Sequence, residues 1–381
     1  MATTNTLTGL IPTIYTALHE VSRENIGFIP NVSRNSKASG AAVGQTVEAP
    51  IAGTAALEDI VAGQEPANSG GATHTKSSVT MTKAKAYPIV WNGEEQLAMG
   101  PSGQYNTLLA DEFSEGFRAI SNAVESDLGD LYKKVARSYG IEGTTPFGTA
   151  NNHTDFAQSN KMLDDLGAPA QGRIMVLGSA ARANVEGIQT GLFHVNEAGD
   201  NGAMLRNRQQ RQLHNFTMGY SAGIKSHTAG AGASYLLNGA LAAGDTTITV
   251  DTGSGTILAG DVVTIGGINH VAVTALSAGV FTIASPGVPA IVADDEAITV
   301  NTTDYTANMV FHKNALLLAT RAPAMPQGGD KADDVMSVTD PVSGLTFQVA
   351  IYKGYKQVKY EIGLVWGVEA PNAKHAGILA G

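Results

Sequence analysis

The feature that most constrains this chain is a segment, residues 104–139, in which apolar residues recur at helical spacing. The steps between them are 4, 4, 3, 4, 4, 3 and 4, which places them on one face of an α-helix. These residues are Leu109, Phe113, Phe117, Ile120, Val124, Leu128, Leu131 and Val135. A Gly-Pro-Ser-Gly turn precedes the segment and Gly140 follows it. The pattern therefore predicts one uninterrupted helix over 104–139.

Such a helix would be long for a chain of this size. At 1.5 Å per residue it would extend roughly 54 Å, whereas a compact chain of 381 residues has a radius of gyration of only about 21 Å. Few other helices are predicted to pack against it. We interpret the segment as the spine of an elongated subunit; a core helix in a large bundle is the alternative interpretation.

Composition excludes several classes of function. The sequence has no cysteine, which removes disulfides, thiolate metal sites and cysteine nucleophiles. The net charge of −10 argues against binding nucleic acid through a broad basic patch. The first residues have neither a basic start nor an apolar core, and the longest aliphatic run, 315–319, is too short to cross a bilayer. We therefore expect no signal peptide and no membrane-spanning segment.

Two segments of different character precede the predicted helix. Residues 1–36 begin with apolar residues at helical spacing and predict an N-terminal helix and arm. Residues 37–97 are rich in Ala, Gly, Thr and Ser, with alternating stretches at 45–50 and 78–91. They predict an extended two-stranded loop that has no core of its own and must lie on another surface. A disordered linker is the alternative for this loop.

The rest of the chain predicts an α+β fold with several parts. Residues 98–150 hold the long helix, and 151–227 with 305–330 read as an α/β domain in which 315–319 is a short helix. Residues 228–304 contain four β runs and no Lys or Arg, which predicts an inserted all-β domain. Residues 331–381 contain three alternating strands that form an antiparallel sheet. We expect the apolar face of the long helix to pack on this sheet.

No catalytic constellation is found. The nine histidines are scattered without H-E-x-x-H spacing, and neither a G-x-S-x-G elbow nor a phosphate-binding loop is present. We therefore predict no enzyme activity and no catalytic, cofactor-binding or metal-binding residues. The acidic run Asp294, Asp295 and Glu296 is compatible with a calcium site, although an exposed acidic turn is the simpler interpretation.

The order of these parts resembles the major capsid proteins of tailed bacteriophages, whose shell fold is named for Hong Kong phage 97. Several stretches resemble the coat proteins of short-tailed Salmonella-type phages, a subgroup that carries an inserted β domain. They are Leu10-Ile11-Pro12 with Arg23-Glu24, Val43-Gly44-Gln45-Thr46-Val47, residues 216–221, residues 308–313, and Leu364-Val365-Trp366-Gly367-Val368. The resemblance covers nearly the whole chain.

The resemblance implies a structural protein that assembles as hexamers and pentamers into an icosahedral head around double-stranded DNA. Residues 98–150 and 331–381 would form a peripheral domain, and 151–227 with 305–330 an axial domain. The implied partners are other copies of the chain, a scaffolding protein, a portal protein, in some heads a decoration protein, and DNA held non-specifically, with no membrane. The implied location is the virion capsid, assembled in the bacterial host cytoplasm.

Two finer expectations accompany this resemblance. Asp294, Asp295 and Glu296 become candidate inter-subunit contacts, and the lysines of the extended loop (Lys76, Lys83 and Lys85) match no crosslinking position, so we predict no crosslink. Two other functions stay open. One is an encapsulin-like shell protein that encloses a cargo enzyme, and the other is a β-rich surface or adhesion protein.

Overall fold

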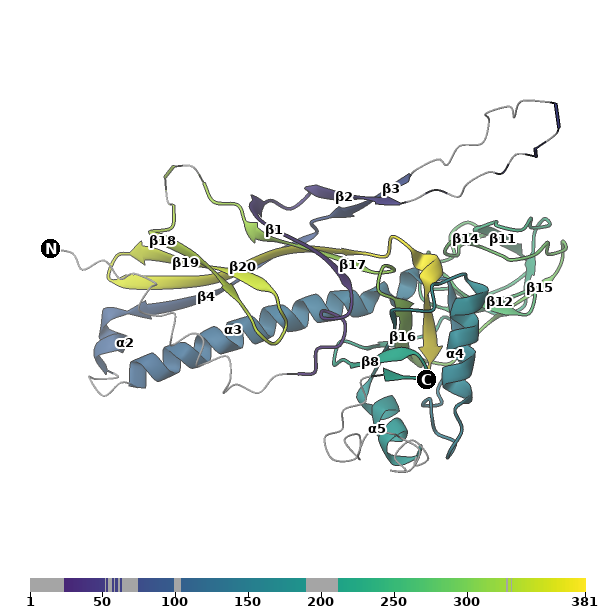
Figure 1. Ribbon diagram of the computed structural model, residues 1–381, viewed down its shortest axis with the longest axis horizontal. Coiled ribbons are helices and arrows are strands. Elements are labelled where there is room, and N and C mark those ends of the chain that lie inside the picture. The colour runs from purple at the N-terminus through teal and green to yellow at the C-terminus, as the bar shows by residue number, and fades with distance from the viewer. Residues whose placement is uncertain are drawn as a thin grey trace.

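The computed structural model describes residues 24–51, 53, 57, 59–60, 62–63, 75–98, 104–189, 212–326, 328–329 and 331–381. The N-terminal helix expected within 1–36 and the Leu10-Ile11-Pro12 stretch lie outside the described residues, as does most of the expected loop between its two strands. The described part is elongated, with a long helix beneath one sheet and a second, larger sheet at the other end (Figure 1).

The first layer pairs the long helix with a mixed sheet. The helix, α3, spans Gln104–Gly129. Among the described residues the sheet has six strands, in the order β1-β17-β20-β19-β18 with β4 also on β20, and only the β1–β17 pair is parallel. The strands are β1 Ser33–Ala41, β4 Lys83–Asn92, β17 Leu317–Pro323, β18 Asp334–Thr339, β19 Thr346–Gly354 and β20 Gln357–Glu369.

The apolar face of α3 packs on this sheet. The rings of Phe113 and Tyr360 lie 5.6 Å apart, and those of Phe117 and Phe347 lie 5.0 Å apart. All four side chains are buried in one core with the rest of the predicted helix face. The indole N–H of Trp366 donates to the Asp127 carboxylate at 2.8 Å, which also fixes the polar edge of the helix to the sheet.

The predicted end of the long helix is wrong. The α-helix stops at Gly129, a 3₁₀ turn (η2) covers Asp130–Lys134, and β5, Arg137–Gly140, is a strand. A side chain at Gly129 would place its Cβ 2.1 Å from the Gly223 carbonyl oxygen, so another backbone passes directly against the chain there. Strand β5 then pairs with two other strands, and sheet hydrogen bonds replace those that a longer helix would make.

The second sheet has 13 strands among the described residues, in the order β14-β11-β10-β15-β12-β13-β5-β21-β16-β6-β8-β7, with β9 on β16. Helices α4, Thr154–Asp165, and α5, Ser179–Gly187, contribute Phe156, Leu163 and Val185 to a core shared with this sheet. Besides β5, the strands of this sheet that lie outside residues 228–304 are β6 Arg173–Leu177, β7 Gln212–Leu213, β8 Phe216–Tyr220, β9 Lys225–His227, β16 Tyr305–His312 and β21 Ala376–Ala380.

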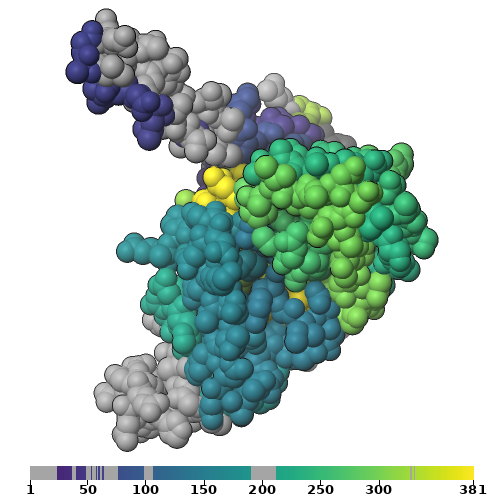
Figure 2. Space-filling model, turned by 90° about the vertical axis from the view of Figure 1, so that its right-hand side faces the viewer, coloured from purple at the N-terminus to yellow at the C-terminus, as the bar shows by residue number. Residues whose placement is uncertain are grey.

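The remaining strands of this sheet form the β unit, which we define as residues 228–304. They are β10 Tyr235–Leu237, β11 Thr247–Asp251, β12 Val262–Ile265, β13 Ile268–Val271, β14 Val280–Thr282 and β15 Ala297–Val300. Most of their buried apolar side chains form a core of their own, to which no other described part of the chain contributes. Val262 and Val271 instead pack into the core beneath α3. In Figure 2 the β unit is the green lobe beside the body. Strand β13 joins it to β5 through the pair His270 and Arg137.

The short helix predicted at 315–319 is also wrong. Ala315 and Leu316 are fully buried, and the chain enters strand β17 at Leu317. Strand β17 pairs with β1 on one side and β20 on the other. Ala and Leu favour helices in isolation, but pairing and burial between two strands override that preference. As a consequence, segment 305–330 is divided between the two sheets, with β16 in the larger and β17 in the smaller.

Candidate functional site

A two-stranded ribbon projects away from both sheets (Figure 1). Its strands, β2 Thr46–Ile51 and β3 Thr75–Thr80, pair only with each other. The base of the ribbon is fixed to the body because Val79 and Met81 are buried against Leu317, Ala319 and Val365. Beyond this base the ribbon has no described core of its own.

The described residues beyond the strands expose large apolar side chains. Leu57 is 96% exposed and Ile60 is 91% exposed. Burying one such side chain contributes about 1.5–3 kcal/mol. A contact that covered these two side chains, which lie between β2 and β3 in sequence, would therefore be favourable. The ribbon is therefore a candidate surface for contact with another protein molecule.

The three lysines of this region are placed as follows. Lys76 pairs across the ribbon with Glu48 at 2.5 Å, and Lys83 pairs with Asp127 of α3 at 2.5 Å. Lys85 is exposed on β4. The first pair is largely exposed and contributes little to stability, whereas the second ties the start of β4 to the long helix.

A buried carboxylate holds the chain where the N-terminal residues join the body. Glu125 of α3 is 2% exposed. Its oxygens accept hydrogen bonds from the backbone N–H groups of Gly27 (2.6 Å), Phe28 (2.7 Å) and Ile29 (3.0 Å), and from the Ser221 hydroxyl (2.6 Å). Such charge-assisted bonds are stronger than neutral ones. Glu125 therefore fixes the backbone of residues 27–29 against α3.

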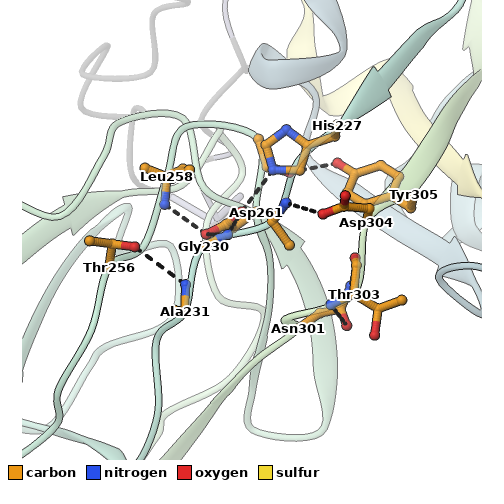
Figure 3. Close-up of polar contacts among 12 residues, drawn as sticks. His227, Gly230, Ala231, Thr256, Leu258, Asp261, Asn301, Thr303, Asp304 and Tyr305 are labelled. Atoms are coloured by element: carbon orange, nitrogen blue, oxygen red, sulfur yellow. Dashed lines mark hydrogen bonds and ion pairs between the residues drawn. The ribbon is translucent and has the colours of Figure 1, made fainter.

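A second buried polar cluster, the neck, joins the β unit to the body (Figure 3). The His227 ring bridges both parts: Nε2 lies 2.7 Å from Asp261 Oδ1, and Nδ1 lies 2.8 Å from the Tyr132 hydroxyl. The Asp261 carboxylate also accepts hydrogen bonds from the N–H groups of Leu258 at 2.7 Å and Gly230 at 3.1 Å. With this many donors, a fully buried carboxylate is stable without a metal or a lysine.

Two tyrosines complete the neck. The Tyr305 hydroxyl donates to the Gly260 carbonyl oxygen at 2.5 Å, and the Tyr305 ring lies edge-on to that of Tyr132. Burial, helped by the nearby Asp130 and Asp261 carboxylates, raises the pKa of Tyr132 to about 12. Burial likewise raises the pKa of Tyr305. Both hydroxyls therefore remain protonated at neutral pH, and their hydrogen bonds tie the β unit to the body.

The side chains of the neck are closed to solvent. Their Tyr132-His227-Asp261 order resembles a proton relay, but all three side chains are buried. The large cavity of about 980 Å³ lies elsewhere, between α5 and β8. There Arg182 is paired with Glu186 at 2.7 Å and stacks on Tyr220 at 4.1 Å.

The described part of the chain contains no cluster of three or more His, Cys, Asp or Glu side chains arranged to hold a metal ion. Within the same residues, no helix is both long enough and apolar enough to cross a membrane.

The acidic run of the β unit forms a turn. Asp294, Asp295 and Glu296 are all exposed. Asp294 Oδ1 accepts hydrogen bonds from the N–H of Gly239 at 2.6 Å and of Asp295 at 3.1 Å, and Asp295 has a φ of 62°. The Asp294 carboxylate therefore stabilises its own turn, and the structure does not gather the three acids around a cation. Their role as inter-subunit contacts stays a prediction.

Sequence reasoning missed Glu125 and the His227–Asp261 pair. One sequence signal for Glu125 was available, because Ser114 and Ser121 share its side of the long helix at steps of 7 and 4. The structure buries all three side chains. His227 immediately precedes residues 228–304, the segment without Lys or Arg. This was a weaker signal, since a lone histidine shows no pattern.

Comparisons with known proteins identify the fold. No protein-family model matches the sequence, and no curated protein matches it. The structure is similar to the capsid asymmetric unit of cyanophage A-1(L), with a TM-score of 0.50 at 8% identity, over 96% of this chain and 92% of that one. The mature capsid of bacteriophage PhiM1 has a TM-score of 0.49 at 11% identity, over 94% of this chain and 88% of that one. The capsid of cyanophage P-SCSP1u has a TM-score of 0.48 at 11% identity, over 94% of this chain and 89% of that one.

The first of these likenesses spans nearly all of both chains, so the chain has the shell fold of phage capsid proteins. This confirms the fold that the sequence resemblance implied. At such low identity the likeness concerns the path of the backbone, and it transfers no individual residue.

Proposed function

We propose that this chain is the major capsid subunit of a tailed phage, assembling as hexamers and pentamers into an icosahedral head that encloses double-stranded DNA. The observation that carries the proposal is the capsid shell fold over 96% of the chain together with a projecting ribbon that has no core of its own. In an isolated subunit the exposed side chains of Leu57 and Ile60 stabilise nothing, whereas a neighbouring copy could bury them.

Assembly then follows from the shape of the subunit. The ribbon and the N-terminal arm expected within 1–36 reach over neighbouring copies, while α3 and the six-stranded sheet form the stiff peripheral domain. Residues 151–227 and the β16 part of 305–330 form the axial domain, and the β unit is the inserted domain of the Salmonella-type coat subgroup. Individual contacts can be weak, because each subunit makes many and ring closure multiplies their effect.

The finer parts of the proposal concern partners and place. The subunit works without catalysis, with a scaffolding protein and a portal protein and, in some heads, a decoration protein. It assembles in the bacterial cytoplasm and remains in the virion. Asp294, Asp295 and Glu296 extend from the β unit toward a neighbouring copy, and packaged DNA is held without base contacts, as the net charge of −10 favours.

The first test is to express the untagged chain alone and with a candidate scaffolding protein, and to examine the products by negative-stain electron microscopy. Closed shells are expected, and heads that take up DNA through a portal would support the phage function. Shells that instead retain a cargo enzyme would replace it with the encapsulin-like function. A monomer under every condition would refute assembly altogether.

The ribbon is tested by the double variant Leu57→Ser with Ile60→Ser. Thermal unfolding of the free subunit should stay unchanged, because both side chains are already in water, while the yield of shells falls. Ile141→Ser is the matched control, since Ile141 is 71% exposed on the body. Equal shell yields from the double variant and the control would contradict a role for the ribbon.

The acidic turn is tested by combining Asp294→Asn, Asp295→Asn and Glu296→Gln. Unchanged assembly of this triple variant would show that the turn is not part of the interface.

A further inference from the structure

Two histidines from distant parts of the chain meet beside the larger sheet. His153 is the residue immediately before α4, and His214 lies in the two-residue turn between β7 and β8. Nδ1 of His153 lies 2.9 Å from Nε2 of His214, and the ring centroids are 4.9 Å apart. The two nitrogens therefore face each other at hydrogen-bond distance, and one ring donates to the other while no ion is bound.

The backbone and a buried aromatic ring fix this geometry. The His214 ring stacks on Phe156, which is fully buried, at 5.0 Å and 17°. The turn itself is held at both residues, because Asn160 Nδ2 donates to the His214 carbonyl oxygen at 2.9 Å and Asn215 Nδ2 donates to the Ala170 carbonyl oxygen at 2.5 Å. The φ angles of 46° and 69° at His214 and Asn215 are those of a tight hairpin turn. The pair is thus formed before any ligand arrives.

The spacing also suits coordination of one ion. Imidazole nitrogens bind zinc at about 2.0–2.1 Å. Two such nitrogens on one ion therefore lie about 2.9–3.4 Å apart when the N–Zn–N angle is between a right angle and the tetrahedral angle. The observed 2.9 Å lies at the short end of this range. The other ring nitrogens, Nε2 of His153 and Nδ1 of His214, would carry the protons. His214 is exposed and His153 is half-buried, so an ion from solution can reach them.

We propose that His153 and His214 form a two-histidine site for a divalent transition-metal ion, with water in the remaining positions. Within the described residues, no third His, Cys, Asp or Glu completes the set, so the site is open and its affinity modest. Imidazole ligands select copper, nickel and zinc over magnesium and calcium, and the expected order of affinity is Cu²⁺ above Zn²⁺ and well above Mn²⁺.

Two other histidine environments in the described chain lack the facing imidazole nitrogens of the His153–His214 pair. His312 and His375 also lie near each other, but their rings are 6.1 Å apart in a T-shaped arrangement. At the neck, both nitrogens of His227 are engaged by Tyr132 and Asp261. Neither environment offers two facing imidazole nitrogens. His312 therefore provides a matched control.

The test is metal titration of the untagged full chain, stripped with a chelator, by calorimetry with Zn²⁺ and Cu²⁺ and by competition with a chromophoric chelator. Wild-type protein should bind one ion per chain at this site, with Mg²⁺ giving no signal. His214→Asn keeps a residue that tolerates positive φ but removes the imidazole, and it should lower the affinity at least about tenfold. His312→Asn should bind like wild type.

The outcomes separate clearly. Loss of binding in His214→Asn and also in His153→Gln, with circular dichroism unchanged, supports the site; His153→Gln leaves the turn untouched, so it decides the matter if His214→Asn disturbs folding. Equal affinity in wild type and both variants, or no binding by wild type, would overturn the proposal. An equal loss in His312→Asn would also overturn it, because it would show that binding is spread over many surface histidines.

Discussion

Lowering the pH from 7 to 5 should destabilise the β unit through one buried imidazole, that of His270. This residue on β13 is 1% exposed and pairs in register with Arg137 of β5, so it lies at the joint between the β unit and the body. Burial, with the positive charge of Arg137 as the second cause, lowers the pKa of His270 to about 4. Among the described residues its Nε2 has no hydrogen-bond partner that could stabilise a proton.

The size of the effect follows from linkage. In the unfolded chain a histidine has a pKa of about 6.5, so as the pH falls the unfolded state binds the proton first. The free energy of unfolding therefore keeps its full value above about pH 6.5, decreases below it, and levels off only below about pH 4. Between pH 7 and pH 5 the decrease due to His270 alone is about 2 kcal/mol.

The assay is urea unfolding at pH 7 and pH 5, followed by far-ultraviolet circular dichroism, on wild type and His270→Gln. Other titrating groups affect both proteins equally, so the difference between their pH dependences isolates His270. The variant should lose about 2 kcal/mol less than wild type over this interval. Tryptophan fluorescence reports Trp91 and Trp366, which lie in the core beneath α3. By this probe the difference in pH dependence between wild type and variant should be smaller. Identical pH dependences by circular dichroism would refute the reasoning.

Two further predictions concern the end of α3, both read as the free energy of urea unfolding. Glu125→Gln should lower it by about 2–4 kcal/mol, because an amide cannot accept all four hydrogen bonds that the carboxylate accepts; the exposed Asp111→Asn on the same helix should change it by less than about 0.5 kcal/mol. Gly129→Ala should lower it by about 1–3 kcal/mol, because the new methyl group would meet the Gly223 carbonyl. Gly187→Ala in α5, where nothing lies within 4 Å, should instead raise it by about 0.5 kcal/mol. Equal effects within either pair would contradict the assigned contacts.

The buried face of the long helix could be predicted from the sequence, but its end could not. Apolar spacing reports which side faces a core, and this information is local. The end is set by the close approach of Gly129 to Gly223 and by the pairing of β5 with β13 and β21. Those partners are far away in sequence, and the apolar steps continue through Leu131 and Val135 although the helix does not.

The same limit explains the other misses. Residues 315–319 have helical propensity, yet their flanking strands come from both ends of the described chain. The neck and the Glu125 cluster each join side chains separated by tens of residues, such as His227 with Asp261 and Ser221 with Glu125. A single polar residue carries no periodicity, so only the folded arrangement shows which of them meet.

The close contact at Gly129 has a geometric consequence for the whole subunit. A helix of 26 residues is about 39 Å long, and the Gly223 backbone lies against its final turn. Because α3 is packed along the six-stranded sheet, a tilt at this contact would move the helix and the sheet together. A tilt of about 5° would displace the opposite end of the helix by about 3 Å, roughly the spacing between a hydrogen-bond donor and its acceptor.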